Sequence, residues 1–134
     1  MLREYPFHIV RPGDIARPYL PITITNPSTG KEVRVYALVD TGADECAFPA
    51  SFAPILDHNL QAGQVRRIGT GNGITVAYGH TTRIAIEDFS TQDVLVDFMP
   101  NLSTPLLGVK SFLCSFVLTI DYPKKTFSLL LPNR

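Results

Sequence analysis

Hydrophobic and polar residues alternate, or form short apolar runs, along most of the chain, and this pattern predicts strands rather than helices. The run Tyr19–Thr25 alternates and is rich in Ile and Thr, which favour strands. Residues 31–39 show a second strand pattern, and residues 26–30 between the two have the composition of a turn. These segments predict a hairpin whose second strand ends at Val39.

The rest of the chain continues the strand pattern, with turns at Pro and Gly positions. The 134 residues include 11 prolines and 9 glycines, which leave little room for long helices. We expect one helical turn within 48–54 and one short helix over 109–114, near the C-terminus. The fold class is therefore predicted as all-β, in a single domain covering residues 1–134. Further strands are expected at 7–10, 64–68, 74–78, 81–87, 93–99, 106–107, 116–120 and 126–130.

Charge and hydropathy exclude two classes of partner. Lys+Arg and Asp+Glu both number 12, so the formal net charge is +0, whereas a nucleic-acid-binding domain usually has a basic excess. No apolar run approaches the ~20 residues needed to cross a bilayer, and the N-terminal residues lack the apolar stretch of a secretory signal. We therefore expect no nucleic acid, no membrane and a cytoplasmic location.

Cysteines and histidines give little support for a disulfide framework or a metal site. Cys46 and Cys114 are too few for a disulfide scaffold and have the wrong spacing for zinc, so both are expected to be buried free thiols. His8, His58 and His80 are scattered and form no metal-ligand pattern. We expect no metal and no cofactor.

The most unusual position is Asp40, an acidic residue at the point where an apolar run stops. A carboxylate at the edge of a core is costly unless it is paired, hydrogen-bonded or used in chemistry. Thr41 adds a hydroxyl group, and Gly42 allows a sharp turn and the close approach of another group. The hairpin that precedes Asp40 gives it a rigid support. These three residues are therefore the first candidate functional segment.

Two glycine-containing features lie further along the chain. The segment 69–73, Gly-Thr-Gly-Asn-Gly, stands between two strand patterns and predicts a hairpin tip, because Asn-Gly is a strong hairpin signal. Three glycines in five residues exceed what a tight turn requires, although an ordinary surface hairpin is the alternative. The segment 106–108, Leu-Leu-Gly, predicts a short buried strand that stops sharply.

Together and in this order, the three features resemble the retropepsin family, the retroviral-type aspartic proteases and their cellular and bacterial relatives. The resemblance extends over residues 19–130, and its last part is more similar to bacterial than to viral members. It implies a retropepsin-like closed β-barrel or sandwich with a flap hairpin, and an aspartic endopeptidase that cleaves peptides or proteins without a cofactor. It assigns catalytic roles to Asp40, Thr41 and Gly42, and substrate binding to Ala43, Asp44, Gly69, Thr70, Gly71, Asn72 and Gly73, with Glu45 as a further contact.

The resemblance also implies a role for each part. Thr41 would bond to the partner loop, Gly42 would lie under the substrate backbone, and the flap would add hydrogen bonds to the peptide like an extra strand. Viral enzymes usually carry Arg directly after the second glycine element, where it pairs with the acid at the position of Asp44. Here that place is Val109, and the adjacent Lys110 is the candidate substitute. Because both ends of the chain also differ from viral termini, a dimer interface would be built differently.

Peptide hydrolysis by this route needs two carboxylates that share one proton around a water molecule. Asp40 begins the only Asp-Thr/Ser-Gly sequence in the chain, so the second acid must come from a second copy. We therefore expect a symmetric homodimer with the two Asp40 carboxylates at its two-fold axis. Aspartates elsewhere in the chain are expected to be solvated, namely Asp14, Asp57, Asp88, Asp93, Asp97 and Asp121.

Two alternatives to a protease are open at this point. One is a non-catalytic peptide-binding or dimerisation module on the same fold, since function depends on the site rather than the fold. The departure after the second glycine element favours it, and the intact Asp-Thr-Gly opposes it. The other is a cation site made by Asp40, Asp44 and Glu45, which offers too few oxygen ligands for Ca²⁺. For substrate pockets the sequence suggests apolar walls at Ile74, Val76 and Leu107.

Overall fold

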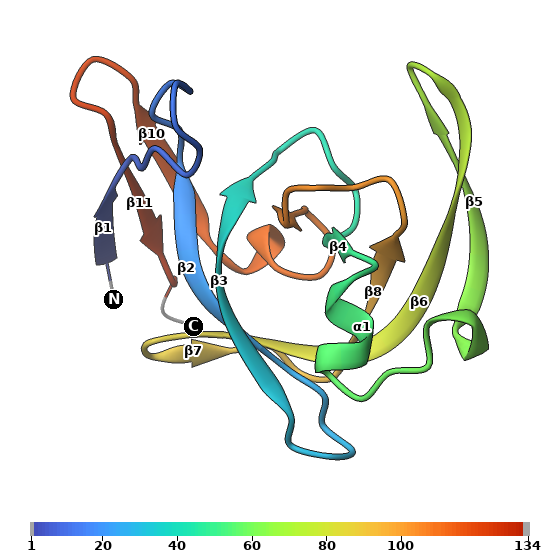
Figure 1. The fold of residues 1–134 in the computed structure, drawn as a ribbon. Coiled ribbons are helices and arrows are strands. Elements are labelled where there is room, and N and C mark those ends of the chain that lie inside the picture. The colour runs from blue at the N-terminus through green and yellow to red at the C-terminus, as the bar shows by residue number, and fades with distance from the viewer. Residues whose placement is uncertain (1, 133–134) are drawn as a thin grey trace.

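The computed structural model describes residues 2–132, and the protein is mostly β (Figure 1). One sheet has eight strands, which are β2 (Tyr19–Thr25), β3 (Glu32–Val39), β4 (Ala47–Pro49), β5 (Gln64–Thr70), β6 (Gly73–Ile86), β7 (Phe89–Ser90), β8 (Val94–Met99) and β9 (Leu106–Leu107). The other has three strands, which are β1 (Leu2–Pro6), β10 (Val117–Asp121) and β11 (Thr126–Leu130). The prediction of an all-β fold is therefore confirmed.

The larger sheet closes on itself as a barrel. β3 pairs with β2 on one side and, in parallel, with β9 on the other. β4 and β8 continue the ring from β9 to β6. β6 then returns to β2, where Ile24 lies opposite Ile84. The expected closed β-barrel is thus confirmed, and the pairing places β5 and β7 outside the ring.

Apolar side chains from alternate strand positions fill the barrel. In β2, Leu20, Ile22 and Ile24 are buried, while the positions between them are more exposed. Phe48 of β4 lies opposite Phe98 of β8, and their ring centroids are 5.9 Å apart in an edge-to-face contact. Burying one side chain of this size contributes about 1.5–3 kcal/mol relative to exposure. This packing fixes the strands from which the functional loops emerge.

One strand, β6, is much longer than expected. The predicted strands at 74–78 and 81–87 belong to a single strand, because Gly79 between them does not interrupt it. Gly79 lies opposite Gln64 of β5 and opposite Asp97 of β8, so β6 is paired on both sides at this point. Figure 1 shows β6 running from the tip of a projecting hairpin into the wall of the barrel.

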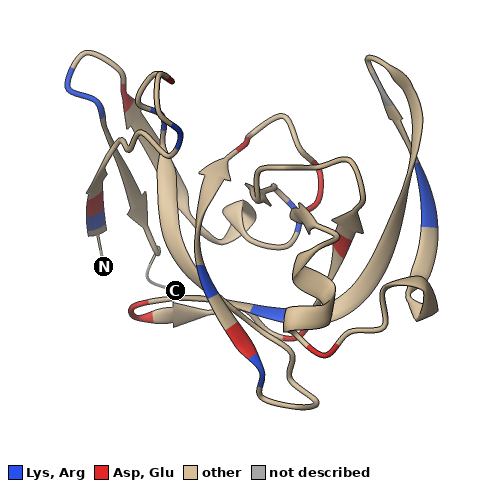
Figure 2. Ribbon diagram, viewed as in Figure 1, with Lys and Arg blue, Asp and Glu red and all other residues tan. Residues whose placement is uncertain are grey.

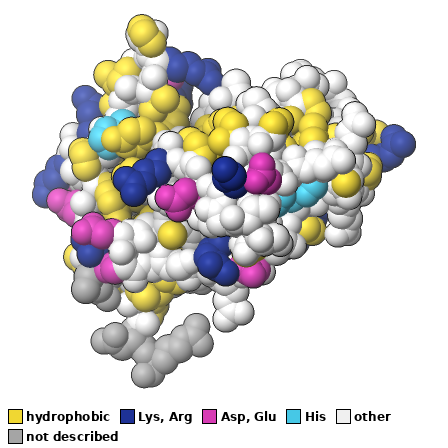
Figure 3. Space-filling view, turned by 60° about the horizontal axis from the view of Figure 1, so that its bottom comes forward, with side chains coloured by type: hydrophobic (Ala, Val, Ile, Leu, Met, Phe, Trp, Pro, Cys, Tyr) yellow, Lys and Arg dark blue, Asp and Glu magenta, His cyan; other side chains and the backbone are white. Residues whose placement is uncertain are grey.

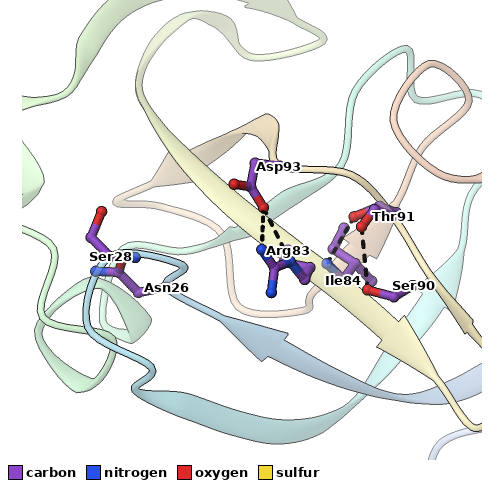
Figure 4. A network of polar contacts seen from close by, with 7 residues as sticks. All are labelled: Asn26, Ser28, Arg83, Ile84, Ser90, Thr91 and Asp93. Carbon is purple, nitrogen blue, oxygen red and sulfur yellow. Dashed lines mark hydrogen bonds and ion pairs between the residues drawn. The ribbon is translucent and has the colours of Figure 1, made fainter.

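Side-chain contacts fix the turn that follows β6 (Figure 4). Arg83 donates two hydrogen bonds to Asp93 Oδ1, at 3.0 and 2.8 Å. The Ile84 N–H donates to Thr91 Oγ1 at 3.0 Å, and the Ser90 hydroxyl donates to the Thr91 carbonyl at 3.2 Å. Because Thr91 is buried, these bonds satisfy polar groups that water reaches poorly. They stabilise the chain next to the pairing of β6 with β2.

The expected first strand at 7–10 is wrong, because the first strand is β1, at Leu2–Pro6. β1 pairs with β11, and the predicted closing hairpin is confirmed as β10 and β11. Arg3 of β1 forms ion pairs with Glu87 and Asp88, each at 3.1 Å. Arg3 therefore finds ionic partners in the tertiary structure, which the local sequence pattern does not reveal.

Three short helical segments complete the fold, namely α1 (Phe52–Ile55) and the 3-10 helices η1 (Leu60–Ala62) and η2 (Leu113–Ser115). α1 confirms the single helical turn predicted within 48–54. The short helix predicted over 109–114 is instead a series of turns that leads into η2. Two N–H groups in this segment bond to carbonyls five residues back, which is too wide a spacing for an α-helix.

Two histidines that are separate in the sequence lie side by side near the base of the β5–β6 hairpin. The ring centroids of His58 and His80 are 4.6 Å apart, and Phe98 packs edge-on against both rings. Nε2 of His80 lies 2.9 Å from the Leu60 carbonyl oxygen. Burial lowers the pKa of His58, His80 lowers it further, and Asp57 acts in the opposite direction.

The helices and one face of the surface bear on the membrane, metal and nucleic-acid expectations. None of the helices within residues 2–132 has the length and apolar character required to traverse a bilayer. In the same residues, no three His, Cys, Asp or Glu side chains form a group that could hold a metal ion. Figure 3 shows one face of the molecule, on which basic and acidic side chains are interspersed. This face has no large basic area of the kind that binds nucleic acid.

Candidate active site

Asp40 lies directly after β3, at the edge of the barrel core. Val39 is 7% exposed, whereas Asp40 is only partly buried, so the acidic residue follows the point where the core ends. The last residues of β3 pair in parallel with Leu106 and Leu107, and the Val39 N–H donates to the Pro18 carbonyl at 3.0 Å. The Asp40 N–H donates to the Leu107 carbonyl, also at 3.0 Å. The backbone at Asp40 is therefore fixed by its neighbours.

A tight turn follows Asp40 and holds its carboxylate. The Gly42 N–H donates to Asp40 Oδ1 at 3.0 Å, and the Ala43 N–H donates to the Asp40 carbonyl at 3.2 Å. A Cβ on Gly42 would lie 3.3 Å from the same Oδ1, so a larger residue would crowd the carboxylate. Thr41 and Gly42 are both exposed. The turn thus orients one oxygen of Asp40 and leaves its outer side open.

The segment that follows β9 holds the other side of this loop. The Val109 N–H donates to the Ala43 carbonyl at 2.9 Å, and the Lys110 N–H donates to the Asp44 carbonyl at 2.8 Å. Backbone hydrogen bonds therefore join the Asp-Thr-Gly loop to the Leu-Leu-Gly element, although the two are far apart in the sequence. The two motifs form one structural unit.

Gly108 is the point of closest approach in this unit. A Cβ at Gly108 would overlap the Glu45 carbonyl, and the Gly108 N–H donates to Cys46 Sγ at 3.3 Å. Burial raises the pKa of the Cys46 thiol to about 12, so the sulfur stays protonated and unreactive at neutral pH. Cys46 is a buried free thiol as expected, but Cys114 is exposed and donates to the Lys110 carbonyl at 3.1 Å.

The side chain of Lys110 pairs with Glu45 rather than with Asp44. Lys110 Nζ lies 3.6 Å from Glu45 Oε1, and the Ser111 hydroxyl donates to Glu45 Oε2 at 3.3 Å. Asp44 is exposed and contacts Lys110 through its backbone carbonyl. Lys110, proposed above as a substitute for the arginine of viral enzymes, therefore forms its ion pair with Glu45, the acid after Asp44.

The glycine-rich segment forms the tip of the β5–β6 hairpin, which we call the flap hairpin. Thr70 lies opposite Gly73 in the backbone ladder, so Gly71 and Asn72 make a two-residue turn. Gly73 has a φ of +113°, which residues with a side chain rarely adopt. Gly69 and the turn are exposed, and the side chain of Thr70 lies outside the described part. In Figure 1 this tip and the loop after β3 stand at the same end of the molecule.

A cavity of about 320 Å³ separates the Asp40 loop from the flap hairpin. Gly42, Ala43 and Asp44 line it from the loop, and Gly69 lines it from the hairpin. The structure therefore brings these four predicted residues to one space. The other lining residues are Glu45, Ala47, Arg66, Ile68, Asp97, Met99 and Leu106.

A second cavity, of about 310 Å³, adjoins the first, because Met99 lines both. Asn72 and Ile74 of the flap hairpin line this second cavity, in agreement with the apolar wall suggested for Ile74. Leu107, however, is fully buried in the core, and its neighbour Leu106 lines the first cavity instead. The reason is that successive side chains in a strand point to opposite faces.

Asp97 and Arg66 are charged cavity residues that the sequence did not indicate. The expectation that Asp97 is solvated is wrong, because it is 3% exposed and its Oδ2 lies 3.3 Å from an Arg66 guanidinium nitrogen. Burial raises the pKa of Asp97, Arg66 lowers it, and Glu45 raises it again. A signal was available, since Asp97 interrupts the apolar pattern of β8 between Val96 and Phe98, which are both buried.

Comparisons with known proteins address the family and the fold. Residues 29–113 match the family described as "gag-polyprotein putative aspartyl protease". No match was found among the curated proteins. The structure is similar to a retropepsin-like aspartic protease from Rickettsia conorii, with 24% identity, a TM-score of 0.67 and coverage of 96% of this chain and 91% of that chain. It is also similar to EIAV protease complexed with the inhibitor HBY-793, with 18% identity, a TM-score of 0.52 and coverage of 75% and 88%.

The two structural likenesses show a shared retropepsin-like fold, which extends further along this chain in the Rickettsia conorii protein than in EIAV protease. The family match includes both Asp40 and Gly108, and thus the whole unit that holds the candidate catalytic loop. It also spans more than half of the chain. The protein therefore belongs to this family of retropepsin-like aspartyl proteases.

Proposed function

We propose that this chain, as one domain over residues 1–134, is an aspartic endopeptidase that hydrolyses extended peptides as a homodimer. One observation carries the proposal. Asp40 directly follows β3 at the edge of the core, the Gly42 N–H donates to its Oδ1 at 3.0 Å, and the loop that follows lines a cavity bordered by the flap hairpin. Membership of the aspartyl protease family supports the same class of reaction.

The proposed mechanism uses the Asp40 carboxyl groups of two copies. Two carboxyl groups held close together cannot both ionise, so they share one proton and titrate with two separate apparent pKa values. The ionised Asp40 takes a proton from water, and the water oxygen attacks the carbonyl carbon of the peptide. The protonated Asp40 gives its proton to the carbonyl oxygen. When the C–N bond breaks, the amide nitrogen takes the proton that the first Asp40 removed from water and leaves as an amine. One hydroxyl group of the tetrahedral intermediate returns its proton to the second Asp40 as the product carboxyl group forms.

The homodimer follows from this chemistry, because each chain contributes one Asp-Thr-Gly sequence. Thr41 is exposed beside Asp40, and we assign it to the contact with the partner loop. Gly42, Ala43 and Asp44 would lie under the substrate. The backbone of residues 69–73 would lie above it and pair with it as an added strand.

The variant Asp40→Asn tests the proposal. Asn has the shape of Asp but cannot ionise, so the variant should fold and should lose cleavage by a factor on the order of 10³ or more. The measurement is cleavage of a mixed peptide library at several pH values, with and without a pepstatin-type inhibitor. The matched control is Asp93→Asn, which removes a carboxylate from the exposed ion pair with Arg83 and should cleave at the wild-type rate.

Cleavage by Asp40→Asn at the wild-type rate would overturn the proposal. A different result would favour the alternative function, a non-catalytic peptide-binding module. If the wild-type chain cleaves no peptide at a concentration where dimers form, while wild type and Asp40→Asn bind the same peptides, the chain is a non-catalytic peptide-binding module on this fold.

A further inference from the structure

We propose that the cavity beside the Asp40 loop selects a carboxamide side chain, Asn or Gln, of the substrate, and that Arg66 and Asp97 recognise it. This inference rests on the proposed function and adds a side-chain specificity to it. It differs from the sequence-based expectation, in which the pockets had apolar walls.

The polar pair bridges two strands of the cavity wall. Arg66 belongs to β5 and Asp97 to β8, and Figure 2 shows a basic segment on β5 and an acidic one in β8, with β6 between these strands. Arg66 lies opposite Ala77 of β6, and Asp97 lies opposite Gly79. Ala77 and Gly79 are two apart and therefore share one face of β6. Arg66 and Asp97 therefore share this face, and the Arg66 side chain reaches Asp97 Oδ2 across β6, at 3.3 Å.

Stability alone does not account for this pair. The Asp97 side chain is 4% exposed and that of Arg66 is 35% exposed, so the Asp97 carboxylate has lost most of its hydration and the Arg66 guanidinium part of it. An apolar pair of similar volume is often as stable as a buried ion pair, because it avoids this cost. The charges do, however, line a cavity beside the candidate catalytic loop, where they can contact a bound molecule.

The donors and acceptors of the pair match those of a carboxamide. A guanidinium group has five N–H donors, and the Arg66 nitrogen in the ion pair lies 3.3 Å from Asp97 Oδ2. A carboxamide offers a carbonyl oxygen that accepts from Arg66 and an NH₂ group that donates to the Asp97 carboxylate. Both hydrogen bonds have one charged partner, which makes them stronger than bonds between neutral groups.

Other side chains fit the same wall less well. A carboxylate would bind Arg66 but would be repelled by Asp44, Glu45 and Asp97, which line the same cavity. A Lys or Arg side chain would be attracted by the same three acids but repelled by the Arg66 guanidinium, with which it would compete for Asp97. An aliphatic side chain would displace water from the pair without replacing the hydrogen bonds, which is costly. The carboxamide is neutral and hydrogen-bonds to both charges.

The test is a kcat/KM profile of the wild-type protein on a peptide library in which each position carries each amino acid in turn. We expect one position at which Asn or Gln exceeds Leu and Glu by about tenfold or more. In Arg66→Met/Asp97→Leu, the preference at that position should move to Leu or Met while cleavage persists. The matched control is Arg67→Met, because Arg67 follows Arg66 on β5 and points to the opposite face, so the wild-type preference should remain.

The possible failures are distinguishable. A wild-type preference for aliphatic, acidic or basic side chains at every position overturns the inference and leaves the protease proposal intact. If no peptide is cleaved, the protease proposal fails, and calorimetry of Asn, Gln, Leu and Glu peptides with Asp40→Asn becomes the test, in which lack of a carboxamide preference overturns the inference. If the double variant does not fold, Arg66→Lys replaces it, since Lys keeps the charge but loses the planar donors, and the carboxamide preference should weaken.

Discussion

The protonation of His58 is coupled to folding, because burial of its side chain lowers its pKa. Its Nε2 lies 3.3 Å from Thr82 Oγ1, and its ring stacks on His80. Burial, the nearby His80 and an opposing effect of Asp57 together place the pKa of His58 below its ordinary value of 6.5. The unfolded chain therefore binds this proton more tightly than the folded protein does. The stability contributed by neutral His58 is complete above pH 6.5 and is lost as the pH falls through the folded-state pKa.

We predict that the free energy of unfolding decreases as the pH falls from about 7 to about 5, and that His58→Gln makes this decrease smaller. Glutamine keeps a polar group beside Thr82 but does not titrate. The measurement is urea-induced unfolding of both proteins at several pH values in this range. Identical pH dependences for wild type and variant would show that His58 does not carry the effect.

Asp40 could be selected as a candidate from the sequence because its signal is local, an acid next to Thr41 and Gly42 after an apolar run. The pair of Arg66 and Asp97 could not be predicted in the same way. It joins β5 to β8 across β6, and so it depends on the order of strands in the sheet. A single sequence does not show that order.

Among the structural elements, the Leu-Leu-Gly segment and the Asp40 loop hold each other in position through close backbone contact. Gly108 sits against the backbone of the loop, where a Cβ would overlap the Glu45 carbonyl and approach the Ala43 carbonyl. Because both neighbours are backbone atoms, neither can move without displacing the loop. The position of Asp40 therefore depends on a residue far away in the sequence.

We predict that Gly108→Ala lowers the free energy of unfolding by about 1–3 kcal/mol or more, because the overlap forces the backbone to shift. It should also reduce cleavage strongly, since the loop carries Asp40. The matched control is Gly69→Ala, where nothing lies within 4 Å of the added Cβ. Thermal unfolding should separate the two variants, and equal melting temperatures would contradict the packing argument.

Strand periodicity located most elements of the barrel but not their lengths or ends. β2 was predicted at its observed bounds, because alternation and a flanking turn both mark it. β6 was predicted as two strands, since Gly79 resembles a break when the pairing with β5 and β8 is unknown. β1 was placed too late in the chain, because its Arg3 and Glu4 lack an apolar pattern and its pairing with β11 is remote in sequence.

For the whole molecule, the single Asp-Thr-Gly makes the proposed activity a property of two chains. The chemistry needs two carboxyl groups, so each active unit must contain two intact copies of Asp40. A copy without this carboxyl group should inactivate the partner with which it pairs. The composition of a mixture should therefore control its activity.

We predict that adding an equal amount of Asp40→Asn lowers the activity per wild-type chain to about half, because half of the wild-type chains then pair with an inactive copy. The measurement is peptide cleavage after the two proteins have exchanged subunits. Adding the same amount of Asp93→Asn, which keeps Asp40, should not lower it. Activity per wild-type chain that is unchanged by Asp40→Asn would mean that one chain is sufficient.

The continuity of β6 has a mechanical consequence. The same strand forms the tip that stands over the cavity and the part of the wall that pairs with β2. The hairpin is therefore fixed at its barrel end, because β6 has no loop between the tip and the barrel wall that could act as a hinge. Its bending should be greatest at the tip and should fade toward Gly79, where strands pair on both sides. A peptide that displaces the tip would thus strain the barrel wall as well, including β8, the strand that carries Asp97.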